Sequence, residues 1–387
     1  MIETLTHADE EALLCRPVRP LMTDADREAF AGQRCVVTGA GGSIGSELAR
    51  QIASCAPALL TLVDHSEHHL FQIERELAEH WPRVALDPVL ADVTRPAMMR
   101  RVCGCARPHV VFHAAAYKHV TMAERAACAT VRVNVLGTAT MVAAAVDVGA
   151  RFLLVSSDKA ASPRSVMGAT KRLAELVTVS AAQATVRPTV VRFGNVLASS
   201  GSFVTIVLDC IHRGKPIPVT APDATRYFMT VREAASLVMK ADALARGGET
   251  FWLDMGEPVR IGDLVNRLLA LAARQGYPAV PIDIVGLRPG EKHIEELTTQ
   301  GLEMLKTAHR RIWTARQARV PPKALGAALR VLRHHVARGN AWETLNALAA
   351  IVPDYEPSAE AWAIARRECI YRQLPEDTPT THRMLTA

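Results

Sequence analysis

Residues 34–53 read RCVVTGAGGSIGSELARQIA, and this stretch decides the fold. Its first apolar residues have the composition of a buried strand, and SELARQIA has the pattern of a helix. Between them, Gly39, Gly42 and Gly45 stand three residues apart. The first permits a tight turn, the second lets a diphosphate approach the backbone, and the third lets helix and strand pack closely. The stretch predicts a loop that presents the N–H groups and the positive dipole end of a helix to phosphates.

An acidic residue follows at a suitable distance. Asp64 ends the next apolar run, LLTLVD, 19 residues after Gly45, where a carboxylate can bind the ribose hydroxyls of an adenosine. A glycine triplet alone would also suit a plain turn, but with Asp64 it favours a dinucleotide site. No arginine directly follows Asp64, so the pattern favours NAD over NADP. We expect Asp92, in LADVT, to flank the adenine, with a strand-end turn as the alternative.

The segment 34–193 alternates short Val/Leu-rich runs with amphipathic stretches of helix length. This alternation is typical of a parallel sheet with crossover helices. The sequence therefore predicts an α/β protein with a Rossmann-like, doubly wound parallel sheet, a smaller C-terminal substrate-binding lobe and a helical C-terminal extension. The predicted parts are a polar N-terminal extension at 1–32, an NAD-binding domain at 33–198 with return segments near 228–254, a lobe at 199–227 and 255–320, and an extension at 321–387. Within that extension, 323–350 and roughly 358–370 are expected to be helical.

The composition is that of an ordinary globular protein. Of the 387 residues, 49% are hydrophobic and 22% are charged, and the net charge of +6 is spread without a Lys/Arg block. Such a surface suits an anionic ligand better than a nucleic acid. The eight cysteines show no zinc spacing, which indicates free thiols in a reducing compartment and no metal site. Because there is no signal-peptide core and no run of 18 apolar residues, we expect a cytoplasmic protein without a membrane span.

A series of motifs makes a family resemblance specific. In chain order they are TGAGGSIGSEL, DHSE, HAAAYKHV, NVLGT, SSDKA, VMGATKR, RFGNVLASSGS, TRYFMT, DMGEPV and GLRPGEK. Through them, residues 11–357 resemble the extended short-chain dehydrogenases/reductases, and among these the nucleotide-sugar 4,6-dehydratases of the polysaccharide-biosynthesis type. The most similar branch acts on UDP-N-acetylglucosamine and retains the C5 configuration. The lead-in EALLCRPV looks like that of longer relatives with transmembrane helices, so the chain resembles their soluble portion.

The resemblance implies a lyase with tightly bound NAD, a UDP-sugar substrate and no net redox change. In the implied cycle, C4 of the sugar is oxidised, water is eliminated across C5 and C6, and hydride returns to C6. The product would be a UDP-linked 4-keto-6-deoxy-N-acetylhexosamine for a surface polysaccharide or glycan, with GDP as the alternative nucleotide. Relatives assemble through the Rossmann helices, so a homo-oligomer is expected. Besides the glycines and acids above, the implied cofactor contacts are Ser43, Ile44, His65, Ser66, Val93, Ala114, Ala115, Ala116, Asn134 and Lys171.

The segment VMGATKR carries a methionine where the wider family has a catalytic tyrosine. Met167 and Lys171 are four residues apart and therefore share one helix face. Lys171 can hydrogen-bond the nicotinamide ribose, whereas a thioether can act neither as an acid nor as a base. The resembled branch also carries methionine here, so Met167 does not by itself imply an inactive enzyme.

The proton chemistry is expected in SSDKA, where Ser157, Asp158 and Lys159 follow a buried strand. Ligands of open α/β sheets bind at that carboxyl edge. The resemblance implies that Lys159 removes the C5 proton and that Asp158 protonates the departing C6 hydroxyl, as elimination requires. A helix-capping Asp beside a surface Lys is the alternative. The base for the C4 hydroxyl is the weakest assignment, for which Ser157 with Asp158 is our hypothesis.

The resemblance also implies a set of substrate contacts. Lys118 would face the sugar nucleotide, and Asn195 would hydrogen-bond its diphosphate. Arg226 and Arg288 would bind phosphate oxygens through paired guanidinium donors, and Glu291 would hold the uridine ribose. The alternatives are a solvated lysine, a turn asparagine and surface salt bridges.

Three other functions compete with a dehydratase. A 4-epimerase of this fold needs the same C4 oxidation but no acid–base pair for C5 and C6, and it normally keeps the tyrosine, so Asp158 and Lys159 argue against it. A non-catalytic protein that binds NAD and a sugar nucleotide would explain Met167 as a trace of lost activity. An ordinary alcohol dehydrogenase would need an exchangeable cofactor.

Overall fold

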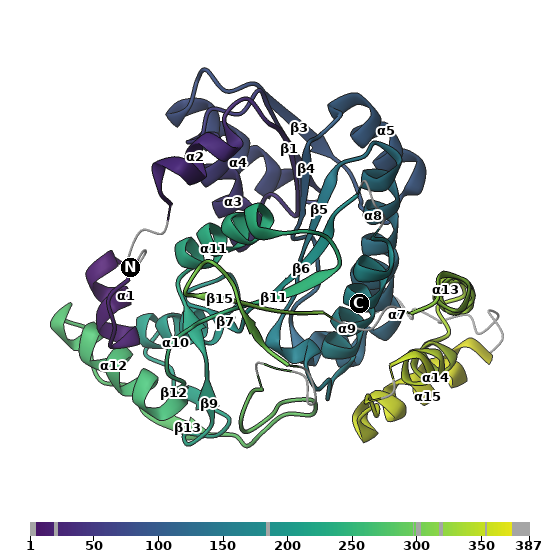
Figure 1. Ribbon diagram of the computed structural model, residues 1–387. Coiled ribbons are helices and arrows are strands. Elements are labelled where there is room, and N and C mark those ends of the chain that lie inside the picture. The colour runs from purple at the N-terminus through teal and green to yellow at the C-terminus, as the bar shows by residue number, and fades with distance from the viewer. Residues whose placement is uncertain are drawn as a thin grey trace, which may run out of the picture.

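The computed structural model describes residues 5–18, 22–182, 186–296, 298, 303–316, 320–352 and 354–373. These residues form a central sheet with helices on both faces, a smaller lobe on one side and a group of C-terminal helices on the other (Figure 1). The last part of the predicted extension, 374–387, lies outside the described residues.

Among the described residues, the main sheet contains nine strands in the order β14-β15-β11-β6-β5-β4-β1-β2-β3. They are β1 (Arg34–Thr38), β2 (Leu59–Asp64), β3 (Leu86–Leu90), β4 (Val110–His113), β5 (Arg151–Val155), β6 (Pro188–Arg192), β11 (Glu249–Leu253), β14 (Leu305–Lys306) and β15 (Ile312–Arg316). Strands β1 to β6 and β11 pair in parallel, whereas β15 is antiparallel to both of its neighbours. The order 3-2-1-4-5-6 is that of a Rossmann fold, so the predicted doubly wound parallel sheet is confirmed.

Alternate residues of each strand pack against helices on opposite faces. In β1, Val37 belongs to an apolar cluster with one set of helices, while Val36 belongs to a cluster with the other set. The first face is covered by α2 (Asp24–Phe30), α3 (Ser43–Ala53), α4 (Glu67–His80) and α11 (Val231–Leu244). The second is covered by α5 (Pro96–Ala106), α8 (Thr138–Asp147) and α9 (Val166–Ser180), and Figure 1 shows the two sets on either side of the strands. Burial on both faces explains why the strands are continuous apolar runs.

The smaller lobe has its own apolar core, to which the N-terminal segment contributes. Its elements are α1 (His7–Leu14), β7 (Asn195–Val196), α10 (Phe203–His212), β8 (Ile217–Val219), β9 (Thr225–Arg226), β10 (Phe228–Met229), β12 (Val259–Arg260), α12 (Ile261–Arg274) and β13 (Ile282–Ile284). Leu13, Leu14 and Val18 are buried in this core. The N-terminal segment, which the sequence predicted to be a polar extension, therefore forms part of the core of the lobe. In contrast, β15, which was assigned to the lobe, pairs with β11 in the main sheet.

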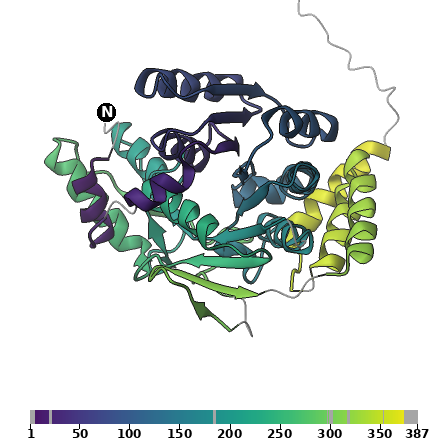
Figure 2. The ribbon, with the colours of Figure 1, turned by 45° about the horizontal axis from the view of Figure 1, so that its top comes forward.

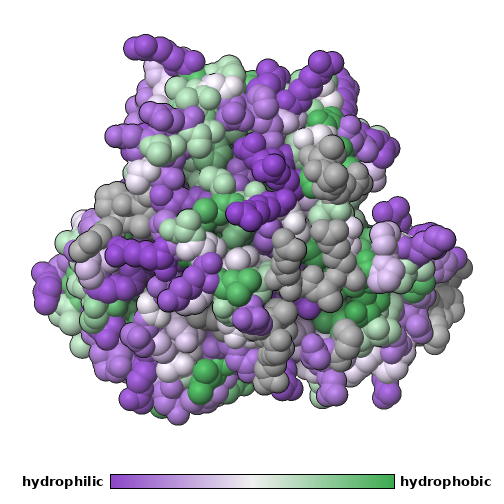
Figure 3. All heavy atoms as spheres, in the orientation of Figure 1, coloured by the Kyte–Doolittle hydropathy of each residue, from purple (hydrophilic) through white to green (hydrophobic). Residues whose placement is uncertain are grey.

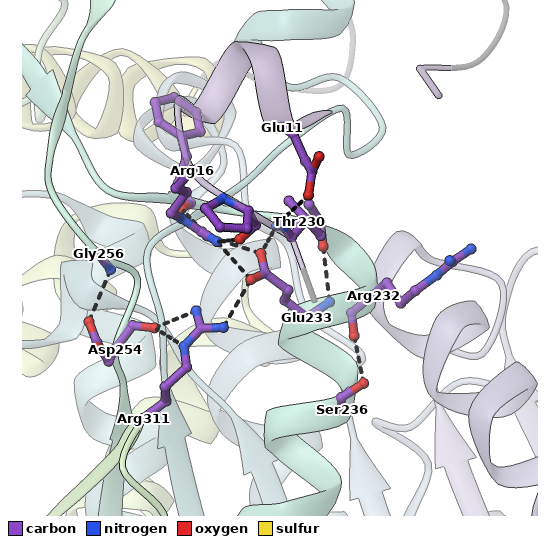
Figure 4. A network of polar contacts seen from close by, with 12 residues as sticks. Glu11, Arg16, Thr230, Arg232, Glu233, Ser236, Asp254, Gly256 and Arg311 are labelled. Atoms are coloured by element: carbon purple, nitrogen blue, oxygen red, sulfur yellow. Dashed lines mark hydrogen bonds and ion pairs between the residues drawn. The ribbon is translucent and has the colours of Figure 1, made fainter. Parts of the chain in front are cut away.

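Buried charges join the N-terminal segment to the sheet (Figure 4). The carboxylate of Glu233, on α11, is 1% exposed and accepts bonds from Arg16 at 2.7 and 3.0 Å and from Arg311 at 2.9 Å. Arg311 also donates to the carbonyl oxygen of Asp254 at 2.9 Å. One carboxylate thus fixes two segments that are nearly 300 residues apart.

The C-terminal extension is helical, as predicted. It comprises α13 (Pro322–Ala337), α14 (Ala341–Ile351) and α15 (Ala359–Gln373). Their buried residues, including Leu332, Leu345 and Leu348, share an apolar cluster with Leu173 and Val177 of α9. The extension also covers α6 (Val120–Arg125), α7 (Ala127–Val131) and the π-helix η1 (Arg132–Gly137). Figure 2 shows it as an outer layer beside these helices.

In the described part of the chain, one helical stretch, Ala127–Asp147, is long and apolar enough to span a membrane. Two thirds of its apolar window, 67%, is buried inside the protein, as expected for a core helix, so it is weak evidence for a span. The face drawn in Figure 3 is largely hydrophilic with small apolar patches.

Candidate functional site

The glycine loop has the geometry that the sequence predicted. Gly39 has a φ of +67°, and a Cβ there would lie 2.7 Å from the Ala115 nitrogen. A Cβ on Gly45 would lie 2.0 Å from the Gly39 oxygen, so helix and loop can pack only through glycine. Gly42 is the N-cap of α3 and provides no side-chain partner for the first N–H groups. The start of α3 therefore suits a phosphate.

Asp64 links this loop to the end of β2. Its two carboxylate oxygens accept bonds from the backbone nitrogens of Gly41 and Ser66, each at 2.9 Å. The side chain is 6% exposed. Since each carboxylate oxygen can accept a further bond, ribose hydroxyls can still bind to it.

A cavity of about 200 Å³ opens in front of these groups. Its lining includes nine of the predicted cofactor residues, Gly39, Gly42, Asp64, His65, Asp92, Val93, Ala114, Ala115 and Ala116. Ser43, Ile44, Gly45 and Ser66 border the loop without lining the cavity. The cavity is also lined by five residues that were not predicted from the sequence, Val63, His69, Ala91, Tyr117 and Val133. His69 was detectable in principle, because it stands four residues after His65 in the same segment.

Asn134 contacts the loop that follows β4 and helix α9. It is 1% exposed, and its amide exchanges bonds with the backbone of Tyr117 at 2.8 and 3.0 Å. It also donates to Thr170 Oγ1, on α9, at 3.0 Å. In this geometry Asn134 fixes the loop after β4 against α9, and any cofactor contact through this side chain remains a proposal.

Asp92 also lines a second cavity, of about 420 Å³, where α5, η1 and α13 meet. Arg95, Arg132 and Arg333 lie along its walls. The C-terminal extension thus reaches the edge of the predicted adenine site.

The catalytic candidates lie at the carboxyl end of β5, in the 3-10 turn η2 (Asp158–Ala160). Asp158 is fully buried, and its Oδ1 accepts bonds from Ser157 Oγ at 2.7 Å and from the Lys159 nitrogen at 2.8 Å. The Lys159 ammonium lies 3.2 Å from the same oxygen. The structure therefore brings the three predicted residues into direct contact.

Several polar atoms around this pair have no partner among the described residues. They are Asp158 Oδ2, Asn195 Nδ2 and Glu295 Oε2. Unpaired buried polar groups cost about 1–3 kcal/mol each, so their concentration in one place indicates a site for a polar ligand. Burial lowers the pKa of Lys159, but the carboxylates of Asp158 and Glu295 outweigh it and raise that pKa above its ordinary value.

Met167 and Lys171 lie on α9 beside this turn. Met167 is 3% exposed and belongs to the apolar cluster that α9 shares with the C-terminal helices. The Lys171 ammonium donates to the Val155 carbonyl oxygen at 2.7 Å. Burial lowers the pKa of Lys171 to about 8, against the opposing effect of Glu175.

Two of the substrate candidates reach the same region. Asn195 Oδ1 lies 3.5 Å from the Lys159 ammonium. Arg226 points its Nε at Glu295 Oε1, 3.7 Å away, while its other nitrogens donate to the backbone oxygens of Thr225, Lys292 and His293. The guanidinium thus holds its own chain in this structure. Its contact with a diphosphate remains a proposal.

The other three substrate candidates, Lys118, Arg288 and Glu291, are exposed or partly exposed. Lys118 is exposed and donates to Ser199 Oγ at 3.2 Å. Glu291 accepts from the Arg288 nitrogen at 3.2 Å, closing a turn in which both side chains are at least partly exposed. This turn abuts the start of α9, because a Cβ on Gly290 would lie 2.8 Å from Ser165 Cβ.

Glu295, which was not predicted from the sequence, is 5% exposed and lies 3.3 Å from the Lys159 ammonium. The available signal was its position four residues after Glu291, in RPGEKHIEEL. Within the described residues, no group of three His, Cys, Asp or Glu side chains is placed to hold a metal ion.

Comparison with known proteins identifies relatives of this chain. The capsular polysaccharide biosynthesis protein CapD of Staphylococcus aureus is 42% identical over 301 residues, which are 76% of this chain and 50% of CapD. The chain therefore spans about half the length of that relative. The structure of Pen from Bacillus thuringiensis matches with a TM-score of 0.69 and 26% identity, covering 78% of this chain and 98% of Pen.

A dTDP-glucose 4,6-dehydratase from Streptomyces venezuelae, DesIV, matches with a TM-score of 0.59 and 21% identity, over 69% of this chain and 88% of DesIV. At that identity the likeness shows a shared fold. Residues 35–317 match the model of a family described as polysaccharide biosynthesis protein. Taken with the glycine loop and the turn after β5, this match shows that the chain belongs to the polysaccharide biosynthesis protein family, within the extended short-chain dehydrogenase/reductase fold.

Proposed function

We propose that this chain is an NAD-dependent nucleotide-sugar 4,6-dehydratase that acts on UDP-N-acetylglucosamine. The observation that carries the proposal is the ion pair between buried Asp158 and partly buried Lys159 at the carboxyl end of β5, surrounded by unpartnered polar atoms. It supplies an acid and a base where the methionine at position 167 supplies neither.

The residues present fit a nicotinamide dinucleotide. The glycine loop leaves no room for a Cβ at 39 or 45, and the N–H groups of α3 meet no capping side chain. Asp64 would hold the adenosine ribose, and Lys171 would stand near the nicotinamide half. When bound, the cofactor would accept hydride from C4 of the sugar and return it to C6.

The chain's own part in the reaction is proton transfer. A side chain must be neutral to act as a base. Before reaction, however, the raised pKa of Lys159 keeps this side chain protonated. Because its ammonium lies 3.2 Å from Asp158 Oδ1, a proton can pass to the carboxylate. This transfer leaves a neutral amine that can take the C5 proton and a neutral acid that can protonate the departing C6 hydroxyl. Burial of Asp158 excludes water from the exchange.

The test is mass spectrometry of UDP-N-acetylglucosamine incubated with the purified protein in D₂O, with and without added NAD⁺. A product that has lost one water and gained one deuterium at carbon supports the dehydratase. Lys159→Met and Asp158→Asn should each lower turnover by about 10²–10⁴, whereas Lys323→Ala, an exposed lysine of α13, should not.

Other outcomes identify the competitors. A UDP sugar of unchanged mass but altered C4 configuration would indicate an epimerase. Tight binding without any conversion would indicate a binding protein. Full activity in Lys159→Met would refute the assignment of Lys159 as the base. Conversion of GDP-linked sugars alone would refute the assignment of UDP as the nucleotide of the substrate.

A further inference from the structure

Glu295 makes two charged contacts at the centre of the candidate site. Its Oε1 lies 3.3 Å from the Lys159 ammonium and 3.7 Å from Arg226 Nε. The side chain is 5% exposed, and its Oε2 has no partner among the described residues. A buried carboxylate in this position is costly unless its charge is paired, so its contacts with the two cations must hold it there.

The backbone around Glu295 is fixed by β9. The Thr225 nitrogen donates to the His293 carbonyl oxygen at 3.1 Å, and Thr225 forms a β-bridge with Ile294. Arg226 donates to the oxygens of Lys292 and His293 at 2.5 and 3.0 Å. Arg226 therefore holds both the backbone and the carboxylate of this segment, and the place of Glu295 beside Lys159 is determined by more than one bond.

Lys159 thus lies between two carboxylates. The charged groups that face it are Asp158 from its own turn, Glu295 from the segment after β13, and Arg226 from β9. The side-chain oxygen of Asn195 lies 3.5 Å from the same ammonium. A single carboxylate would pair the ammonium equally well, so the second one needs a separate explanation.

We propose that Glu295 is a positioning residue for Lys159, which holds the ammonium between itself and Asp158 and keeps it protonated until the sugar nucleotide binds. The proposal deepens the dehydratase function and rests on it for its catalytic meaning. Glu295 would act through Lys159 rather than on the sugar. Without it, Lys159 would lose its proton at lower pH and would be free to move away from Asp158.

The first test needs no activity. The protein is labelled with ¹³C at the lysine ε-carbon, and the Lys159 signal is assigned by its absence from Lys159→Arg. In the parent, this signal should stay at its protonated position as the pH is raised to about 10, beyond which lysines ordinarily titrate. In Glu295→Gln, the acid dissociation constant of Lys159 should rise about tenfold or more, because an opposite charge has been removed.

The matched control is Glu296→Gln. Glu296 is the next residue, it is exposed, and it accepts a bond from Ser162 rather than from Lys159. It should leave the titration of Lys159 unchanged. Should Glu295→Gln fail to fold, Glu295→Asp, which keeps the charge but shortens its reach, should give a smaller change in the same direction. A Lys159 titration in either folded Glu295 variant that matches the parent would overturn the proposal.

A kinetic measurement then separates this inference from the proposed function. If the chain is a dehydratase, the basic limb of its kcat/KM profile should move to lower pH in Glu295→Gln, because Lys159 then loses to solvent, at lower pH, the proton that it must pass to Asp158; the loss in kcat should exceed the loss in substrate affinity. A parent protein that turns over no sugar nucleotide would refute the dehydratase, while the NMR titration would still decide whether Glu295 controls Lys159.

Discussion

The ammonium of Lys171, on α9, donates a hydrogen bond to the carbonyl oxygen of Val155, the last residue of β5, across 2.7 Å. The lysine is 7% exposed, and burial lowers its pKa to about 8 despite Glu175. The same contact joins the helix of Met167 to the strand that leads into Asp158. This one hydrogen bond therefore connects Lys171, the proposed cofactor contact, to the strand that leads into Asp158, the proposed proton donor.

The lowered pKa of Lys171 predicts how stability depends on pH. A base with a lower pKa in the folded state binds fewer protons there, so the free energy of unfolding should rise as the pH increases from about 8 to about 10.4. Lys171→Met removes this contribution, which is on the order of 3 kcal/mol. Urea denaturation across this pH range should show a shallower rise in the variant. Equal slopes in the two proteins would contradict the lowered pKa.

The close packing of the glycine loop predicts a second result. Gly45→Ala places a methyl group 2.0 Å from the Gly39 oxygen, so α3 must shift away from the loop. The change should cost about 1–3 kcal/mol of stability and should abolish the binding of NAD⁺ measured by calorimetry. The control is Gly104→Ala on α5, where nothing lies within 4 Å of the new methyl group. It should stabilise the protein by about 0.5–1 kcal/mol and leave binding intact.

Position 167 offers a third test. Because Met167 is nearly fully buried among apolar side chains, Met167→Leu should change stability by less than about 1.5 kcal/mol and should leave turnover close to the parent value. Met167→Tyr brings a hydroxyl into this cluster and should cost about 1–3 kcal/mol without raising turnover. Thermal unfolding and the sugar-nucleotide assay provide both readouts. Turnover lost in the leucine variant at unchanged stability would show that the sulfur takes part in the reaction.

Glu233 predicts a response to acid. Burial would raise its pKa, but bonds from Arg16, the Thr230 nitrogen and Arg311 outweigh burial and lower the pKa below its usual value. Its stabilising contribution is therefore present above pH about 4.5 and is lost as the pH falls through the lowered pKa.

Glu233→Gln should reduce stability at neutral pH by about 3 kcal/mol, because two arginines lose their shared carboxylate. The difference between variant and parent should shrink below pH about 4. Glu257→Gln, on an exposed residue, serves as the control. A difference that stays constant from neutral to acidic pH would exclude the ion pairs as its source.

Local sequence patterns predicted most of the fold. The glycine triplet predicted the loop before α3, because the tight packing at Gly39 and Gly45 requires glycine at positions that are close together in the sequence. The continuous apolar runs predicted a parallel sheet, because strands buried on both faces need them. The apolar run before Asp158 and Lys159 likewise predicted that the two residues follow the carboxyl end of a buried strand.

Features that depend on distant contacts were not predictable in this way. Glu295 approaches Lys159 only because Thr225 and Arg226, some 70 residues earlier, hold its segment. Leu13 and Leu14 stand in a segment rich in acidic residues, and only the lobe core shows why they are buried. Arg226 pairs with its own backbone, which a phosphate-binding pattern cannot reveal.

The three C-terminal helices have a consequence for how copies of the chain can meet. Leu173 and Val177 of α9 are covered by Leu332, Leu345 and Leu348 of the same chain. The C-terminal extension thus covers a face of α9 that would otherwise be open to a second copy of the chain. Two chains could pair through that face only after α13, α14 and α15 had swung away, and such an exchange would trade an intramolecular contact for an identical one between chains.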